Sequence, residues 1–178
     1  MPILSDIPAD IRRAACAFHE AGHIVVGWEH RRHITHTWLR PPYGFSGETC
    51  FEPYKRGFQI DSPVDRQRAE IEIIILSAGY CGEMIYWNEE GLKWYPGAIA
   101  SHEDDLRQMK PYLALLQPPD EAALRARCTN AATAILYRPA MLAALAAIAR
   151  RLADRRRIDR DEVDEIIEGA AGRVPPRA

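Results

Sequence analysis

The sequence predicts a mainly helical α+β domain in which a small antiparallel β-sheet packs against the first helix. Several long segments carry apolar residues at the spacing of an amphipathic helix, and most of them begin at proline, serine or aspartate. One stretch, residues 34–53, instead has short β-prone runs around a turn-rich centre. The length of 178 residues suits a single domain that spans residues 1–178.

The first helix is expected at residues 8–32, where a proline precedes a long run with apolar positions on one face. A β-hairpin follows. Its strands lie at residues 34–39 and 48–51, and the proline- and glycine-rich segment 41–47 makes the turn. Residues 58–60 are a candidate for a short third strand.

A second long helix is expected at residues 62–87. Its centre, residues 71–79, is almost wholly apolar and rich in β-branched side chains, which would also suit a strand. The charged run at residues 65–70 favours a helix instead. Glycine and proline then predict a loop over residues 88–100.

The next helix begins with a capping box, in which Ser101 is the N-cap and Asp104 reaches back to it. Pro111 is expected to kink or end this helix, because proline lacks the amide hydrogen that helical bonding needs. Three further helices complete the chain, at about residues 120–137, 139–153 and 159–169.

Composition excludes several classes of partner. The formal net charge of −2 gives no reason to expect nucleic acid, and the arginines at residues 155–157 are followed at once by acidic residues. No signal peptide is expected at the N-terminus, and no uncharged apolar stretch reaches the roughly 18 residues of a membrane span. The four cysteines form no CxxC pair, so reduced thiols in a cytoplasmic protein are expected.

The sequence His19-Glu20-Ala21-Gly22-His23 is an HExxH motif inside the first predicted helix. Residues four apart share one helix face, so His19 and His23 can point at one metal ion. Two imidazoles suit zinc, and Glu20 lies close enough to act as the general base on a water molecule that the metal activates. The alternative is a surface helix that carries these residues by accident.

A catalytic zinc site needs a third protein ligand. His30 lies too far along an unbroken helix from His23. The long metzincin form of the motif requires glycine where this chain has Val26, so that form is excluded. His33 and His36 would reach the site only through a sharp turn.

The acidic candidates for the third ligand are Glu83 and the cluster Glu103, Asp104 and Asp105. Acidic residues in a first helical turn commonly serve the helix dipole, which explains Glu103 and Asp104 without a metal. Asp105 lies one position beyond the expected capping residue. The pattern alone therefore favours Asp105 only slightly over Glu83.

The chain resembles the peptidase domain of FtsH-type ATP-dependent zinc proteases in several segments, which occur in the family's order. The resemblance implies a helical zincin-type fold, His19, His23 and Asp105 as zinc ligands and Glu20 as the base. It also implies that Glu83 orients a ligand histidine. The matching segments are HEAGH at 19–23, the hairpin at 34–53 with GETCFEP, LSAGYCGE at 76–83, ASHEDDL at 100–106, and the closing helices at 137–167.

Two departures from the family qualify the resemblance. Tyr80 and Gly82 replace the family's arginine and alanine after the helix glycine, and the sequence contains no GxxxxGK[ST] phosphate-binding loop. We therefore expect a stand-alone zinc endopeptidase, without the ATPase module or membrane anchor, that cleaves unfolded or flexible polypeptides independently of ATP. A separate ATPase partner and the oligomeric state stay open. The alternatives are a catalytically idle zinc-bound interaction module and a regulatory, repressor-cleaving metallopeptidase.

Overall fold

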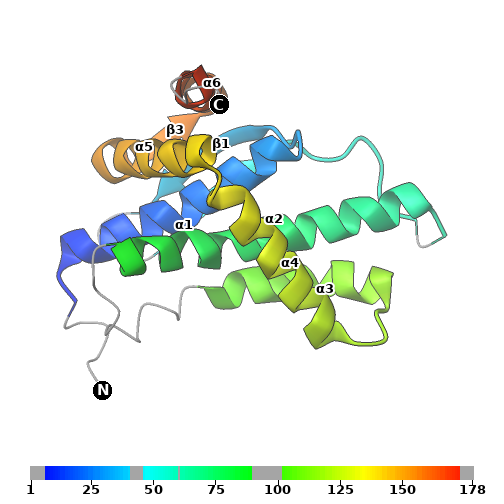
Figure 1. Ribbon diagram of the computed structural model, residues 1–178. Coiled ribbons are helices and arrows are strands. Elements are labelled where there is room, and N and C mark those ends of the chain that lie inside the picture. Colours follow the sequence, from blue (N-terminus) through cyan, green and yellow to red (C-terminus); the bar gives the residue numbers. More distant parts are fainter. Residues whose placement is uncertain (1–6, 41–45, 60, 90–101, 173–178) are drawn as a thin grey trace, which may run out of the picture.

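Helices α1 (Ala9–Glu29) and α2 (Pro63–Glu89) pack against each other and make the most extensive contact between any two described elements (Figure 1). The computed structural model describes residues 7–40, 46–59, 61–89 and 102–172. A side chain at Gly22 of α1 or at Gly82 of α2 would collide with a backbone carbonyl of the other helix. Glycine at these positions therefore allows the two backbones to approach closely.

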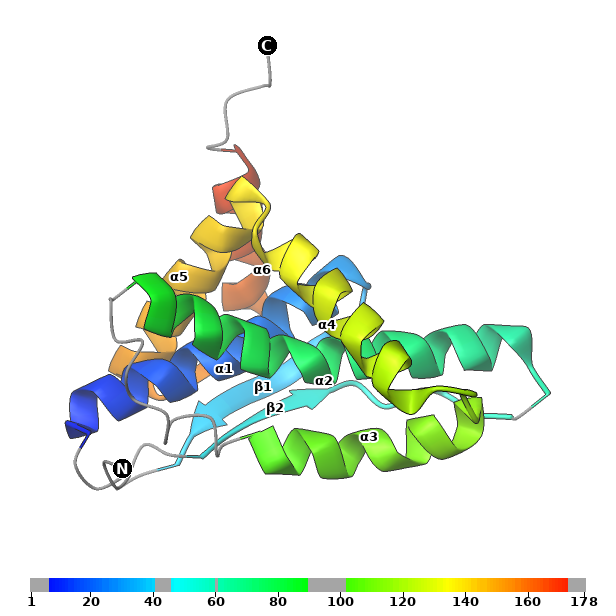
Figure 2. The same ribbon diagram turned by 60° about the horizontal axis from the view of Figure 1, so that its bottom comes forward.

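The other described helices surround this pair (Figures 1 and 2). Helix α5 packs on α1 and α6 packs on α5, whereas α3 and α4 pack on α2. Together with a small antiparallel sheet, this arrangement confirms the predicted mainly helical α+β fold class. The bounds are α3 (Glu103–Leu116), α4 (Glu121–Leu136), α5 (Pro139–Arg155) and α6 (Arg160–Gly172).

The sheet has the strand order β2-β1-β3, and both pairs are antiparallel. Strands β1 (Ile34–Leu39) and β2 (Gly47–Phe51) form the predicted hairpin. The third strand is β3 (Arg157–Asp159), so the prediction of a strand near residues 58–60 was wrong; residues 58 and 59 lie outside any strand. Local pattern fails here because β3 is very short and pairs with a strand remote in the sequence.

The register places Thr37 of β1 between Thr49 of β2 and Ile158 of β3. Thr37 and Ile158 are fully buried. Within the described residues, β2 pairs with β1 alone, so it is an edge strand. Figure 2 shows β2 on the side of the molecule that carries α3.

Helix α3 continues through Pro111, contrary to the prediction that this proline kinks or ends it. Pro111 lies on the exposed face, so the carbonyl left without a helical partner remains near solvent. On the opposite face, Met109, Leu113 and Leu116 are buried in one hydrophobic cluster with residues of α2. This packing holds the helix together, and α3 ends only where Gln117 adopts a left-handed φ of 43°.

The remaining predicted helices are confirmed, with shifts at their ends. The Asp120 carboxylate accepts a hydrogen bond of 2.9 Å from the Ala123 amide and caps α4, and α5 begins at the predicted Pro139. Helix α1 ends earlier than expected because Arg31 has a left-handed φ of 58°. Helix α6 continues to Gly172.

Two further predictions concern residues 90–101, which lie outside the described residues. The loop expected at residues 88–100 is wrong for residues 88 and 89, which belong to α2, and the rest of it lies outside the described residues. The capping box at Ser101 also lies outside them. Asp104 forms an exposed ion pair of 2.6 Å with Arg107.

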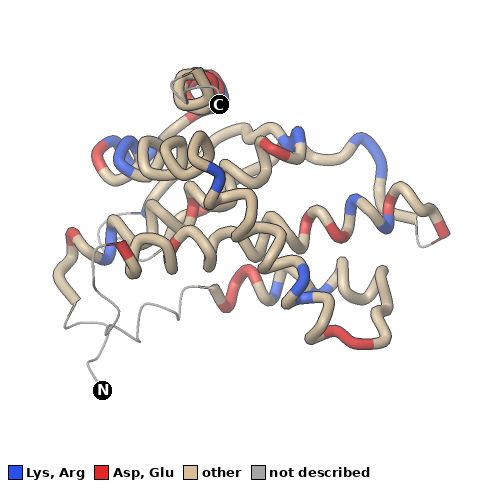
Figure 3. The backbone as a smooth tube through the Cα atoms, in the orientation of Figure 1, with Lys and Arg blue, Asp and Glu red and all other residues tan. Residues whose placement is uncertain are grey.

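Charged residues of both signs are interspersed along the described backbone (Figure 3). The arginine-rich end of α5 follows this rule, because Arg151 and Arg155 both pair with Glu162 of α6. Among the described residues, no single helix has the length and apolarity to cross a membrane; α4 and α5 pass that test only as a pair bent by 88°.

Candidate metal centre

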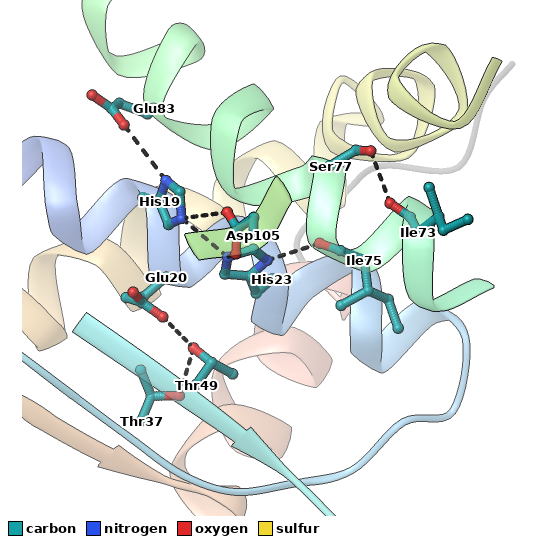
Figure 4. Close-up of polar contacts among 10 residues, drawn as sticks. All are labelled: His19, Glu20, His23, Thr37, Thr49, Ile73, Ile75, Ser77, Glu83 and Asp105. Carbon is teal, nitrogen blue, oxygen red and sulfur yellow. Dashed lines mark hydrogen bonds and ion pairs between the residues drawn. The ribbon is translucent and has the colours of Figure 1, made fainter. Parts of the chain in front are cut away.

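Helix α1 carries His19, Glu20 and His23 in its middle, and all three side chains are buried. The Nε2 atoms of the two histidines lie 3.1 Å apart, with their rings in an edge-to-face arrangement (Figure 4). This is the consequence of the four-residue spacing, which places both rings on one helix face. The two nitrogens therefore converge on one small volume.

Asp105, in the first turn of α3, brings a carboxylate to the same volume. Its Oδ2 lies 3.0 Å from His19 Nε2, and its Oδ1 lies 3.4 Å from His23 Nε2. In the part of the chain that the structure describes, His19, His23 and Asp105 are the one group of this kind whose ligand atoms are close enough to hold a metal ion. The structure thus brings Asp105 to the two histidines, and keeps the exposed Asp104 away from them.

The second ring nitrogen of each histidine faces a group on α2. His23 Nδ1 donates a hydrogen bond of 2.8 Å to the carbonyl oxygen of Ile75 in α2. His19 Nδ1 lies 3.5 Å from Glu83 Oε2, while the other oxygen of Glu83 accepts a hydrogen bond from the Trp87 indole. A proton on Nδ1 leaves the lone pair on Nε2, which is the arrangement that metal-binding histidines use.

Asp105 supplies a second sign that the site suits a cation. Its Oδ2 is buried, and although His19 Nε2 lies 3.0 Å away, no donor among the described residues reaches this oxygen with hydrogen-bond geometry. A buried carboxylate oxygen that lacks a well-formed hydrogen bond is costly, and a bound ion would remove that cost. The residues present therefore fit a metal ion.

The electrostatic environment is strongly negative. Burial alone lowers the pKa of His19, but the neighbouring Asp105 and Glu83 carboxylates outweigh it and raise this pKa from 6.5 to about 10. Burial raises the pKa of Asp105, yet the two nearby imidazoles hold it well below its usual range. The carboxylates thus favour positive charge in the centre, whether carried by protons or by a metal ion.

The backbone of α2 covers the two histidines at Gly79. A Cβ atom at this position would lie 2.5 Å from Nε2 of both His19 and His23. Any side chain here would occupy space beside the two candidate ligand atoms. Glycine at position 79 is therefore a requirement of the centre.

Glu20 points away from the metal-binding group and toward strand β2 (Figure 4). Its Oε2 accepts a hydrogen bond of 2.7 Å from the Thr49 hydroxyl. Glu20 lines a cleft of about 510 Å³ that also contains His19, His23 and Asp105. The walls come from β2 on one side and α3 on the other, with Gly47 and Gln108 among their residues.

Cys16 also lines this cleft but does not belong to the metal-binding group. Burial, together with the charges of Glu20 and Glu83, raises the pKa of the Cys16 thiol well above its ordinary value. A protonated thiol is a weak ligand, so Cys16 acts as a small apolar wall residue.

Sequence reasoning missed three contributors to the centre: the Ile75 carbonyl, Gly79 and Thr49. No sequence signal identifies a backbone carbonyl as a partner. Thr49 and Gly79 lie within the segments that carry the resemblance to FtsH-type peptidases, but residue type alone does not distinguish them from structural residues. Their contacts depend on how α2 and β2 approach α1.

No protein-family model and no curated protein matches this chain. The resemblance to FtsH-type peptidases therefore stays a prediction. The geometry itself defines a class of site: a buried group of two imidazoles and one carboxylate that could hold a metal ion, with the Glu20 side chain in the same cleft.

Proposed function

We propose that this chain is a zinc-dependent endopeptidase of the FtsH-like type. The observation that carries the proposal is the convergence of His19, His23 and Asp105 at a cleft that also contains Glu20. Two histidines alone would also fit the alternative that a helix carries the HExxH residues by accident, without binding a metal. A third ligand from a different helix, placed on the same volume, supports a metal site.

Zinc is the proposed metal, because the HExxH motif with its glutamate is the arrangement that zinc metalloproteases use. Two imidazoles and one carboxylate supply three of the four tetrahedral positions, and catalytic zinc sites keep the fourth for water or substrate. Mg²⁺ and Ca²⁺ prefer sites made of oxygen atoms, and each would meet two nitrogens here. The free state of all four cysteines also suits a reducing compartment such as the cytoplasm.

When bound, the zinc ion would polarise the peptide carbonyl and lower the pKa of water. The chain's own residues perform the proton transfers. Glu20 takes a proton from the attacking water molecule while the oxygen of that water bonds to the carbonyl carbon. Glu20 then gives the proton to the amide nitrogen when the C–N bond breaks. The Ile75 carbonyl holds a proton on His23 Nδ1, and the Glu83 carboxylate, 3.5 Å from His19 Nδ1, would favour the same tautomer of His19.

The proposed substrate is unfolded or flexible polypeptide. The cleft runs between α3 and β2, and an extended peptide could add to the edge of β2 as another strand. A stably folded domain offers such a segment only when it opens locally. With no phosphate-binding loop in the sequence, cleavage is proposed to be independent of ATP unless a separate ATPase delivers the substrate.

The test is cleavage of casein by the purified protein, with and without a zinc chelator, compared with a stably folded protein. The Glu20→Gln variant should bind metal normally but lose at least about 100-fold in kcat, because the amide does not accept the proton. Glu29→Gln, at the end of the same helix, is the matched control and should cleave as the wild type does.

Each outcome separates the proposal from its rivals. Metal binding without cleavage of any substrate would favour the idle interaction module. Cleavage confined to one folded repressor would favour the regulatory peptidase. Normal cleavage by Glu20→Gln would show that Glu20 is not the base.

A further inference from the structure

We propose that Thr49 is a positioning residue that holds the carboxylate of Glu20 in place. Strand β2, and not helix α1 alone, then sets the orientation of the general base. This inference rests on the proposed peptidase function and extends it to a residue outside the HExxH motif.

The hydrogen-bond geometry gives Thr49 a defined direction. Thr49 Oγ1 donates to Glu20 Oε2 at 2.7 Å, and Thr37 Oγ1 donates to Thr49 Oγ1 at 3.2 Å (Figure 4). A hydroxyl has one proton, so accepting from Thr37 leaves the proton of Thr49 for Glu20. Thr37 is fully buried and lies opposite Thr49 in the β1–β2 register, so the sheet fixes the start of this chain of bonds.

Gly47 adds a steric constraint on the other carboxylate oxygen. A Cβ atom at position 47 would lie 2.5 Å from Glu20 Oε1. The backbone of β2 therefore passes directly beside Glu20, and glycine at this position allows that approach. Strand β2 contacts the carboxylate at both oxygens, through a hydrogen bond at one and through backbone packing at the other.

The two carboxylate oxygens of Glu20 have different environments. Oε2 is occupied by the Thr49 hydroxyl, whereas Oε1 accepts no hydrogen bond from any described residue. Oε1 is therefore the oxygen left to accept a proton in the cleft. A glutamate side chain has several rotatable bonds, and a hydrogen bond to an ionised carboxylate is strong enough to select one orientation.

The experiment compares Thr49→Val with Thr49→Ser and measures kcat and KM on a casein-derived fluorogenic peptide. Valine keeps the shape and removes the hydroxyl, so kcat should fall about 10- to 100-fold, as expected for loss of a hydrogen bond to a charged group, with KM within about twofold. Serine keeps the hydroxyl and should restore kcat to within about threefold of the wild type. Zinc content should stay unchanged in both.

Two further variants test whether the loss of kcat comes from the displaced Glu20 carboxylate. Thr35→Val makes the same change in β1, where the hydroxyl of the exposed Thr35 donates to the Cys50 carbonyl, and should leave kcat unchanged. Gly47→Ala should lower kcat as Thr49→Val does, because the new methyl group displaces the Glu20 carboxylate. Thr49→Ala is measured alongside, so that the inference is decided even if the valine variant does not fold.

The outcomes distinguish this inference from the proposed function. Wild-type kcat in folded Thr49→Val or Thr49→Ala, with Glu20→Gln inactive, overturns the positioning role and leaves the peptidase intact. A failure of serine to restore kcat also overturns it. A wild-type protein that cleaves nothing overturns the proposed function and this inference together.

Discussion

Gly79→Ala adds one methyl group to α2 at the point where this helix covers the two histidines. The new Cβ atom would lie 2.5 Å from Nε2 of His19 and 2.5 Å from Nε2 of His23. Ordinary van der Waals contacts begin near 3.4 Å, so the rings must shift by about 1 Å. Metal–ligand distances tolerate changes of only about 0.2 Å.

The magnitude of the effect follows from this mismatch. We expect the zinc affinity of the Gly79→Ala variant to fall at least about 100-fold, which corresponds to about 2.7 kcal/mol. The fold should survive, because an overpacking cost of about 1–3 kcal/mol is offset by about 1 kcal/mol of helix propensity gained when alanine replaces glycine. The variant thus separates metal binding from stability.

The assay is competition for zinc against a chromophoric chelator, with urea unfolding of the metal-free protein followed by circular dichroism. Gly57→Ala is the matched control, because a Cβ at position 57 meets nothing within 4 Å. It should change neither the affinity nor the free energy of unfolding by more than about 0.5 kcal/mol. A folded Gly79→Ala protein with wild-type zinc affinity would refute the placement of the histidines beneath this glycine.

Three further predictions follow from the structure. Asp105→Asn should weaken zinc affinity sharply, whereas Asp104→Asn should leave it unchanged, as isothermal titration would show. Chelation should lower the thermal midpoint, because a ligand at 1,000 times its Kd stabilises the folded state by about 4.1 kcal/mol. Burial raises the pKa of Asp65, but the Gln59 amide and Arg56 outweigh it and lower the net value below 3.8. The stability that Asp65 contributes is therefore present near neutral pH and lost as pH falls below about 4, and urea unfolding of Asp65→Asn should show a flatter acid limb.

The sequence predicted the parts of the site that depend on local spacing. The i, i+4 separation of His19 and His23 is enough to place both rings on one face of a helix. The third ligand depends on how α3 packs against α1 and α2, so helical pattern alone barely separated Asp105 from Glu83. The resemblance to a known family favoured Asp105, and the structure places that carboxylate beside both histidines.

The fold shows the same division between local and remote information. Helices α1, α2 and α5 each begin at or directly after a proline, and their positions were predicted to within a few residues. The prediction that Pro111 kinks or ends α3 was wrong because tertiary packing of α3 on α2 outweighs the loss of one helical hydrogen bond. Strand β3 was missed because three residues with one buried side chain, Ile158, are too few to form a recognisable alternating pattern.

The position of β3 in the sequence has a consequence for biosynthesis. The β1–β2 hairpin can form soon after it leaves the ribosome, but the other edge of β1 stays open until residues 157–159 emerge. An open strand edge in a nascent chain invites pairing with other chains, and here four helices are synthesised before it closes. Insertion of Ile158 beside Thr37 then completes the sheet, so we expect newly made protein to acquire full activity only after its last strand has docked.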